Sequence, residues 1–130
     1  MYHRIQTSKP QQFIDITDIG KEDVRNSHVQ DGIVVVYVPH TTAGVTINEN
    51  ADPDVVHDMI KALDKTYPIH GDYRHFEGNS HAHIKASLMG ASCVVIIRNG
   101  RLVLGTWQGI YFCEFDGPRN REFYVKIINE

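Results

Sequence analysis

The sequence has 130 residues, which is the length of one domain with one hydrophobic core. Hydrophobic residues make up 42% and charged residues 22%, an ordinary globular composition that excludes a disordered chain. The net charge of −3 excludes a general nucleic-acid binder, which would carry a basic excess. The longest apolar run, residues 33–38, is far shorter than the ~20 residues of a membrane span. We therefore expect one soluble domain over residues 1–130.

The N-terminal segment MYHRIQTSKP has no apolar stretch, so we expect no secretory signal and a cytoplasmic location. Cys93 and Cys113 lie in apolar, strand-like segments and are interpreted as buried free thiols. The unusual count is histidine: there are eight, and seven of them fall between His28 and His83.

The first half of the chain is dominated by strand patterns. Residues 12–17 largely alternate polar and apolar, which predicts a half-buried strand. Residues 21–28 are interpreted as a short helix with Val24 as its core anchor. Residues 33–38 are continuous and mostly β-branched, which predicts a strand buried on both faces. Residues 44–48 alternate again and predict another strand.

The clearest helix begins after Asp52, whose carboxylate can accept from the first free backbone N–H groups. Pro53 suits the first helical position because its missing donor has no partner there. An apolar stripe then recurs at spacings of four and three, and the helix ends at residues 67–68. The stripe consists of Val56, Ile60 and Leu63.

A long loop over residues 66–80 precedes a second short helix, residues 81–89. Loops of this length inside a compact domain are often functional. Asn99-Gly100 is a strong hairpin signal between two of the remaining strands. These strands are expected over residues 93–98, 101–106, 108–115 and 121–128. The whole pattern predicts an α+β fold with a large mixed, mostly antiparallel sheet and two or three helices.

The histidines offer the first candidate site. Three neutral imidazoles that converge on one point can hold a metal ion, with water in the open position of a catalytic site. The candidates are His40, after a buried strand, His75 in the long loop, and His81 or His83 at the second helix. Residues two apart do not share a helix face, so only one of the last two can face the site if the segment is helical. The alternative is that these histidines are ordinary hydrogen-bonded loop residues.

Other polar residues are candidates for binding or catalysis. Residues 40–44 follow a strand and could hold an anion, or form an ordinary polar turn. Glu49 could be a base or a metal ligand, or stabilise the helix that follows it. In residues 107–115 the odd-numbered face is expected in the core. The opposite face, with Gln108 and Glu114, suits either a pocket wall or a solvent-exposed face. The basic residues nearest these segments are Arg74, Lys85, Arg119 and Arg121.

Three segments closely resemble the YjbQ-like family, also called the secondary thiamine-phosphate synthase family. They are HTTAGVTINENADPDVVHDM (residues 40–59), YRHFEGNSHAHIKASLMG (73–90) and GRLVLGTWQGIYFCEFD (100–116). The resemblance implies an α+β fold, a trimeric assembly, metal binding by histidines and a weak thiamine-phosphate synthase activity. The family's histidine pattern matches His40, His75 and His83, whereas position 81 varies in the family and is often aspartate. Motif positions without an assigned role are matched by Glu49, Lys85, Trp107, Gln108, Glu114 and Arg121.

An enzyme of this kind joins hydroxymethylpyrimidine diphosphate to a thiazole phosphate and expels pyrophosphate. The charge of the leaving group calls for a divalent cation or clustered cationic side chains. We assign the metal to His40, His75 and His83. Imidazole ligands suit zinc better than magnesium, which stays the second candidate. The phosphorylated substrate is assigned to Lys85, Arg121 and Trp107.

Glu49, Gln108 and Glu114 are the candidate catalytic residues. Glu49 is preferred over Glu114 as the acidic partner because it can fold back toward His40. Gln108 and Glu114 are six residues apart on one strand, about 20 Å, so both cannot touch one ion.

The absence of a glycine-rich phosphate loop and of an acidic magnesium cluster keeps a second hypothesis open. It is a metal-dependent hydrolase, or a metal- or ligand-binding protein of unknown substrate, and a purely structural role is a third. The expected partners are a phosphorylated small molecule and further copies of the chain in a homotrimer, because many strand edges need covering. Neither a nucleic acid nor a membrane is expected as a partner.

Overall fold

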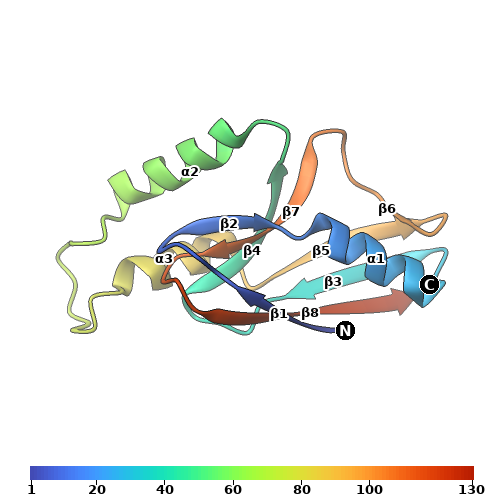
Figure 1. Cartoon of the computed structure of the whole chain (residues 1–130), viewed down its shortest axis with the longest axis horizontal. Helices are drawn as coiled ribbons and strands as arrows, with labels where there is room; N and C mark the ends of the chain where they lie inside the picture. Colours follow the sequence, from blue (N-terminus) through green and yellow to red (C-terminus); the bar gives the residue numbers. More distant parts are fainter.

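The strands form two antiparallel sheets, one of five strands and one of three (Figure 1). A computed structural model describes all residues, 1–130. The larger sheet has the order β1-β8-β3-β5-β6, and the smaller sheet has the order β2-β7-β4. In chain order the elements are β1 (Tyr2–Gln6), β2 (Gln12–Asp15), α1 (Thr17–Ser27), β3 (Gly32–Tyr37), β4 (Ala43–Glu49), α2 (Pro53–Thr66), α3 (Ser80–Met89), β5 (Ser92–Arg98), β6 (Arg101–Leu102), β7 (Gln108–Glu114) and β8 (Asn120–Asn129).

The α+β class predicted from the sequence is confirmed, with differences in single elements. The strands divide into two sheets rather than one, and every strand pair is antiparallel. β1 is not among the predicted strands; it pairs along β8 and covers that edge of the larger sheet. The strand predicted over residues 101–106 is limited to β6.

Local hydrogen bonds decide where the helices begin. α2 begins as predicted: the Asp52 carboxylate accepts from the Asp54 backbone N–H at 2.9 Å, and Pro53 is the first helical residue. α1 begins at Thr17 rather than at residue 21, because the Asp15 carboxylate accepts from both the backbone N–H and the hydroxyl of Thr17. None of the helices is both long and apolar enough to span a bilayer.

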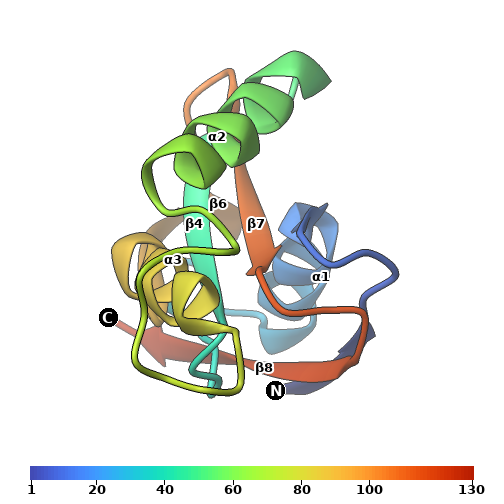
Figure 2. The ribbon, with the colours of Figure 1, turned by 90° about the vertical axis from the view of Figure 1, so that its left-hand side faces the viewer.

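The main core lies between the two sheets and α1. It includes Val34 and Phe123 of the larger sheet, Phe112 of the smaller sheet and Val24 of α1, the anchor predicted from the sequence. A second core lies on the other side of the smaller sheet, beneath α2 and α3. Figure 2 shows α1 and α3 on opposite sides of β4 and β7, with α2 across the top of the two strands.

Both faces of β7 are buried, so neither the pocket wall nor the exposed face predicted for this strand is present. Ile110 and Phe112 belong to the main core, and Tyr111 and Cys113 belong to the second core. A sheet covered on both sides buries the side chains of its central strand whatever the alternation in the sequence, and in β7 only the first residue, Gln108, is exposed. Cys113 is a buried free thiol, as predicted.

The outward face of the larger sheet, which we call the outer sheet face, is apolar and uncovered. The β-branched run of β3 predicts burial on both faces, and within one chain this is wrong: Val34 and Val36 are 1% exposed, but Tyr37 is 47% exposed. Large apolar side chains from four strands share this exposure. They are Tyr2, Tyr37, Val94, Ile96, Tyr124 and Ile128.

Candidate functional site

The candidate residues predicted from the sequence lie in several separate places within one chain. No group of three or more histidine, cysteine, aspartate or glutamate side chains is arranged to hold a metal ion. His40, His75 and His83 therefore do not converge within a single chain. A zinc ion bound by three imidazoles needs three ring nitrogens at about 2 Å from one point.

His40 lies beside β8 with its acceptor nitrogen already in use. Its Nε2 accepts a hydrogen bond from the backbone N–H of Glu122 at 3.0 Å, which places the proton of the neutral ring on Nδ1. Burial, and then the charge of Arg121, lowers the pKa of His40 and keeps the ring neutral. A neutral ring bonded in this way has no lone pair free for a metal. His40 lines a surface hollow of about 680 Å³ together with Tyr2 and Arg4.

Glu114 and Arg121 form a buried ion pair, with side chains 0% and 3% exposed. Arg121 Nε donates to both carboxylate oxygens, at 2.9 and 3.1 Å, and Nη2 donates to Glu114 and to the Thr42 hydroxyl. The Thr7 hydroxyl and the Asp116 backbone N–H also donate to Glu114, at 2.7 and 3.1 Å. Burial acts to raise the pKa of Glu114, but the hydrogen bonds from Arg121 and Thr7 outweigh it and lower the pKa. In this arrangement the two side chains bind each other rather than a substrate.

His75 and His83 are the two predicted metal ligands that the structure brings together. The loop before α3 and the first turn of α3 place their ring centroids 5.6 Å apart, with the ring planes at 86°. No hydrogen bond within the chain engages either ring, and the nearest carboxylate oxygen, on Glu77, is 3.8 Å from His75 Nε2. Both rings line an open hollow of about 550 Å³, which Arg74 also lines. The pair has lone pairs available for a metal or protons available for a ligand.

Lys85 is wholly buried between α2 and α3 instead of facing a hollow. Its ammonium donates to the Asp64 carboxylate, to Gln11 Oε1 at 3.2 Å and to His81 Nδ1 at 2.9 Å. The Gln11 amide donates in turn to both Asp64 oxygens, at 2.9 and 3.0 Å. Each of the three ammonium N–H groups thus has an acceptor, so Lys85 has no donor left for a ligand. We call these four residues the buried lysine network. A phosphate could reach Lys85 only by displacing one of them.

His81 and His83 point to different sides of α3, as their spacing in a helix predicts. His81 is 5% exposed and accepts from Lys85, whereas His83 lies beside His75. Because Lys85 donates to Nδ1, the proton of neutral His81 is on Nε2. Burial, and then the charge of Lys85, lowers the pKa of His81. His81 therefore belongs to the interior of the fold, and His83 is the histidine of this pair that a ligand can reach.

Glu49 and Gln108 lie at the end of the smaller sheet that is far from Glu114. Glu49 is directly opposite Gln108 in the ladder between β4 and β7. The prediction that Glu49 folds back toward His40 is wrong, because residues 43–49 form one continuous strand, about 20 Å long.

The turn before β7 engages Gln108 and leaves Trp107 in water. Gln108 Oε1 accepts from the backbone N–H of Gly105 at 2.8 Å, so its amide oxygen closes the turn. Trp107 is 62% exposed at the same turn. Within one chain these two residues are far from the ion pair of Glu114 at the other end of the strand.

Several residues that contact or adjoin the candidate site residues were not identified from the sequence. Asp64 and Gln11 hold Lys85, and Thr7 holds Glu114, but each is separated from its partner by a long stretch of chain. Phe76, next to His75, is 95% exposed. The only feature of the sequence that points to Phe76 is its position as an aromatic residue within the polar loop segment RHFEGN.

We expect the free energy of unfolding to fall as the pH is lowered from about 7 to about 5. The native state lowers the pKa values of His40 and His81 below the ordinary 6.5, so the unfolded chain binds protons first and gains stability as the pH falls through 6.5. A second loss follows below the ordinary carboxylate range, because the pKa values of Asp64 and Glu114 are also lowered. Urea unfolding at a series of pH values measures both.

The matched control for this pH dependence is His57, which is exposed on α2. His40→Gln and His81→Gln should each flatten the slope between pH 7 and 5, since glutamine keeps an acceptor but takes up no proton. His57→Gln should leave the slope as it is. Equal slopes in all three variants would contradict the assignment.

The chain matches the family model described as "UPF0047 protein YjbQ-like" over residues 1–130. A UPF0047 protein of Methanocaldococcus jannaschii is 56% identical over 128 residues, 98% of this chain and 93% of that protein. The UPF0047 protein YugU of Bacillus subtilis is 53% identical over 126 residues, 96% of each chain.

Solved structures agree with this result over the whole fold. The crystal structure of an uncharacterised YjbQ/UPF0047 protein of Clostridium acetobutylicum has a TM-score of 0.97 and 63% identity, covering 98% of this chain and 99% of that one. A protein of unknown function from Sulfolobus solfataricus has a TM-score of 0.96 at 32% identity, covering 100% and 96%. The chain belongs to the YjbQ/UPF0047 family.

Proposed function

We propose that this chain is a subunit of an oligomeric, metal-binding enzyme that acts on a phosphorylated small molecule. The observation that carries the proposal is the His75–His83 pair, two adjacent imidazoles that no group of the chain engages in a hydrogen bond. Arg74 lines the same hollow, and a guanidinium suits a phosphate. The proposed reaction is of the thiamine-phosphate synthase type. The thiazole nitrogen attacks the methylene carbon of hydroxymethylpyrimidine diphosphate, the carbon–oxygen bond breaks, and pyrophosphate leaves with the electron pair.

One chain supplies the type of ligand that zinc prefers, the imidazole nitrogen, but too few of them. A catalytic zinc takes three protein ligands and keeps one position open, and one chain brings only His75 and His83 together. We assign the third ligand to His40 of a neighbouring copy, with its hydrogen bond to the Glu122 backbone released. When bound, the metal supplies charge neutralisation for the leaving pyrophosphate. Arg74 contributes a second positive charge to the same hollow.

His75→Ala and His83→Ala should each remove the bound metal. Elemental analysis of protein purified without added metal measures this directly. His57→Ala is the matched control, because His57 is an exposed histidine on another helix and should leave the metal content unchanged. Wild-type protein without a transition metal, or full metal content in both variants, would contradict the proposal.

The outer sheet face supports the homotrimer that this proposal needs. β3 carries a sequence suited to burial on both faces, and one chain covers only one of them. Ile96, which is 52% exposed at the centre of this face, tests the assembly.

Ile96→Glu should convert the trimer to a monomer, measured by light scattering, whereas Ile96→Val should not. The monomeric variant should also lose its metal, because the third ligand comes from a neighbour. A wild-type mass of 14.8 kDa, that of one chain, would contradict the trimer.

Hydrolysis is the second candidate reaction, and the openness of the hollow favours it. The side chain of His75 is 42% exposed, so one chain does not exclude water from the reacting groups. Pyrophosphate release from hydroxymethylpyrimidine diphosphate without the thiazole substrate would indicate hydrolysis. Release that requires the thiazole phosphate would indicate transfer.

A further inference from the structure

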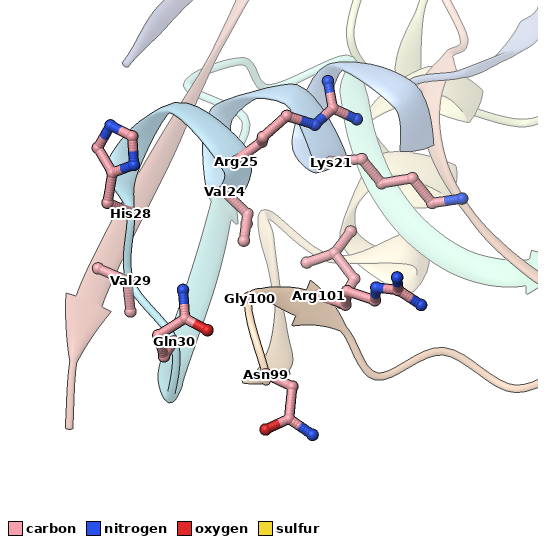
Figure 3. A pocket seen from close by; sticks show the side chains of 10 residues that line it. Lys21, Val24, Arg25, His28, Val29, Gln30, Asn99, Gly100 and Arg101 are labelled. Atoms are coloured by element: carbon pink, nitrogen blue, oxygen red, sulfur yellow. The ribbon is translucent and has the colours of Figure 1, made fainter.

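A third hollow lies at the other end of the molecule from His75 and His83. It is formed by the C-terminal half of α1, the segment that follows α1 and the β5–β6 hairpin, and its volume is about 720 Å³ (Figure 3). α1 and the hairpin lie at one end of the long axis, and the loop that carries His75 lies at the other (Figure 1). We call this hollow the basic pocket, because its lining contains four basic side chains and no carboxylate. These basic residues are Lys21, Arg25, His28 and Arg101.

Backbone conformation fixes the two walls of the basic pocket relative to each other. The chain turns away from α1 at His28, whose φ is 60°, and the hairpin turns at Asn99 and Gly100, whose φ values are 52° and 73°. The Gly100 N–H then donates to the backbone oxygen of Gln30 at 2.9 Å. The hairpin tip is thereby tied to the segment after α1, so the pocket exists before any ligand arrives. A preformed site loses less entropy on binding.

Two of the cations lack a direct ion pair within the chain, although the charge of Lys21 reaches the Asp15 carboxylate and lowers its pKa. Arg25 pairs with Glu22, but Lys21 and Arg101 form neither an ion pair nor a side-chain hydrogen bond. Figure 3 shows the side chains of Lys21 and Arg101 extending toward the same side of the pocket. Arg98, directly opposite Arg101 in the hairpin ladder, places a further like charge beside Arg101, outside the lining of the pocket. Like charges opposite each other destabilise a strand pair, and a bound anion would relieve the repulsion.

The remaining lining suits the organic part of a ligand. Leu102, which is half-buried, provides apolar surface, while the side chains of Gln30 and Asn99 provide amide donors and acceptors. Small-molecule sites combine apolar surface with a few polar groups in this way, at volumes of about 300–1,000 Å³. The chain's net charge of −3 favours a small anion over a nucleic acid.

We propose that the basic pocket binds a phosphorylated heterocyclic molecule, with its phosphate between Lys21 and Arg101. The heterocycle lies on Leu102, within reach of the amides of Gln30 and Asn99. This site is separate from the His75–His83 hollow and does not depend on the function proposed there.

Adenosine 5′-monophosphate is the probe, and its binding to the wild-type chain is measured by amide NMR shifts and calorimetry. We expect shifts over residues 21–30 and 99–102, and a dissociation constant that rises with salt concentration. Lys21→Gln and Arg101→Gln should each weaken binding about tenfold, as expected for the loss of a charged hydrogen bond. Both side chains are exposed, so these variants keep the fold.

Lys65→Gln is the matched control, because Lys65 is an exposed lysine in the last turn of α2 and should leave the affinity unchanged. Inorganic phosphate should bind the same residues more weakly than the nucleotide. The proposal is overturned if these residues show no shifts, if Lys65→Gln weakens binding as much as Lys21→Gln, or if phosphate binds as tightly as the nucleotide. Nucleotide-induced shifts confined to residues 74–83 would place the nucleotide in the His75–His83 hollow instead and would also overturn the proposal.

Discussion

Replacing Arg121 with methionine will lower the free energy of unfolding by about 3–5 kcal/mol. The variant leaves the Glu114 side chain, which is 0% exposed, without its cation. Only the Thr7 hydroxyl and the Asp116 backbone N–H then donate to it. The carboxylate must stay charged in apolar surroundings or take up a proton, and both weaken the native state. Urea unfolding monitored by circular dichroism measures the loss.

Two variants separate the buried charge from other effects of this substitution. Glu114→Gln combined with Arg121→Met should recover most of the lost stability, because no buried charge is left unpaired. Arg119→Met removes an arginine that is 49% exposed and pairs with Asp116, and should change stability by less than about 1 kcal/mol. A loss in Arg121→Met no larger than that in Arg119→Met would contradict the structural role and return Arg121 to the candidates for phosphate binding.

Elements with a strong local signal are predictable from this sequence. Asp52 and Pro53 mark the start of α2, and the Asn99-Gly100 pair marks the β5–β6 hairpin, where both residues adopt the positive φ that such turns require. The start of α1 is different, because it depends on hydrogen bonds between the Asp15 carboxylate and Thr17 that no periodicity reveals.

The burial of charged side chains is not predictable in the same way. Lys85 and Arg121 look like surface cations in the sequence, and a phosphorylated substrate, if one is expected, suggests them as its binding residues. Both are buried because each has a carboxylate partner from another element, Asp64 or Glu114. Such pairs arise from the packing of elements, which local patterns do not describe.

The positions of the three predicted metal ligands also depend on contacts that local patterns do not describe. The sequence motifs include His40, His75 and His83 in one family pattern. Such a pattern does not tell whether its residues meet within one chain or between chains. Helix spacing does correctly separate His81 from His83, because that relation is local to α3. The hydrogen bond from the Glu122 backbone to His40 comes from β8, far along the sequence.

Asp64→Asn will lower the free energy of unfolding by about 3 kcal/mol, more than the removal of its cationic partner. The variant leaves the Lys85 ammonium, which is wholly buried, with only neutral acceptors, those of Gln11, His81 and the new amide, and with no anion beside it. Lys85→Met should lower it by only about 1 kcal/mol. In that variant the Asp64 carboxylate is still bonded by the Gln11 amide, and its side chain, 36% exposed, can be solvated by water.

The order of these two effects is the test. A partly exposed anion that loses its partner costs less free energy than a buried cation that loses its partner. Urea unfolding of both variants is compared with that of Asp58→Asn, an exposed aspartate on the same helix that should change stability by less than about 0.5 kcal/mol. A larger loss in Lys85→Met than in Asp64→Asn would contradict the expected order, and losses in both variants as small as that in Asp58→Asn would mean that the lysine is not fixed by its carboxylate. It would then be free to turn toward a substrate, and the phosphate-binding role predicted from the sequence would be restored. The expected order instead makes the buried lysine network the clamp between α2 and α3, and so the support on which α3 carries His83.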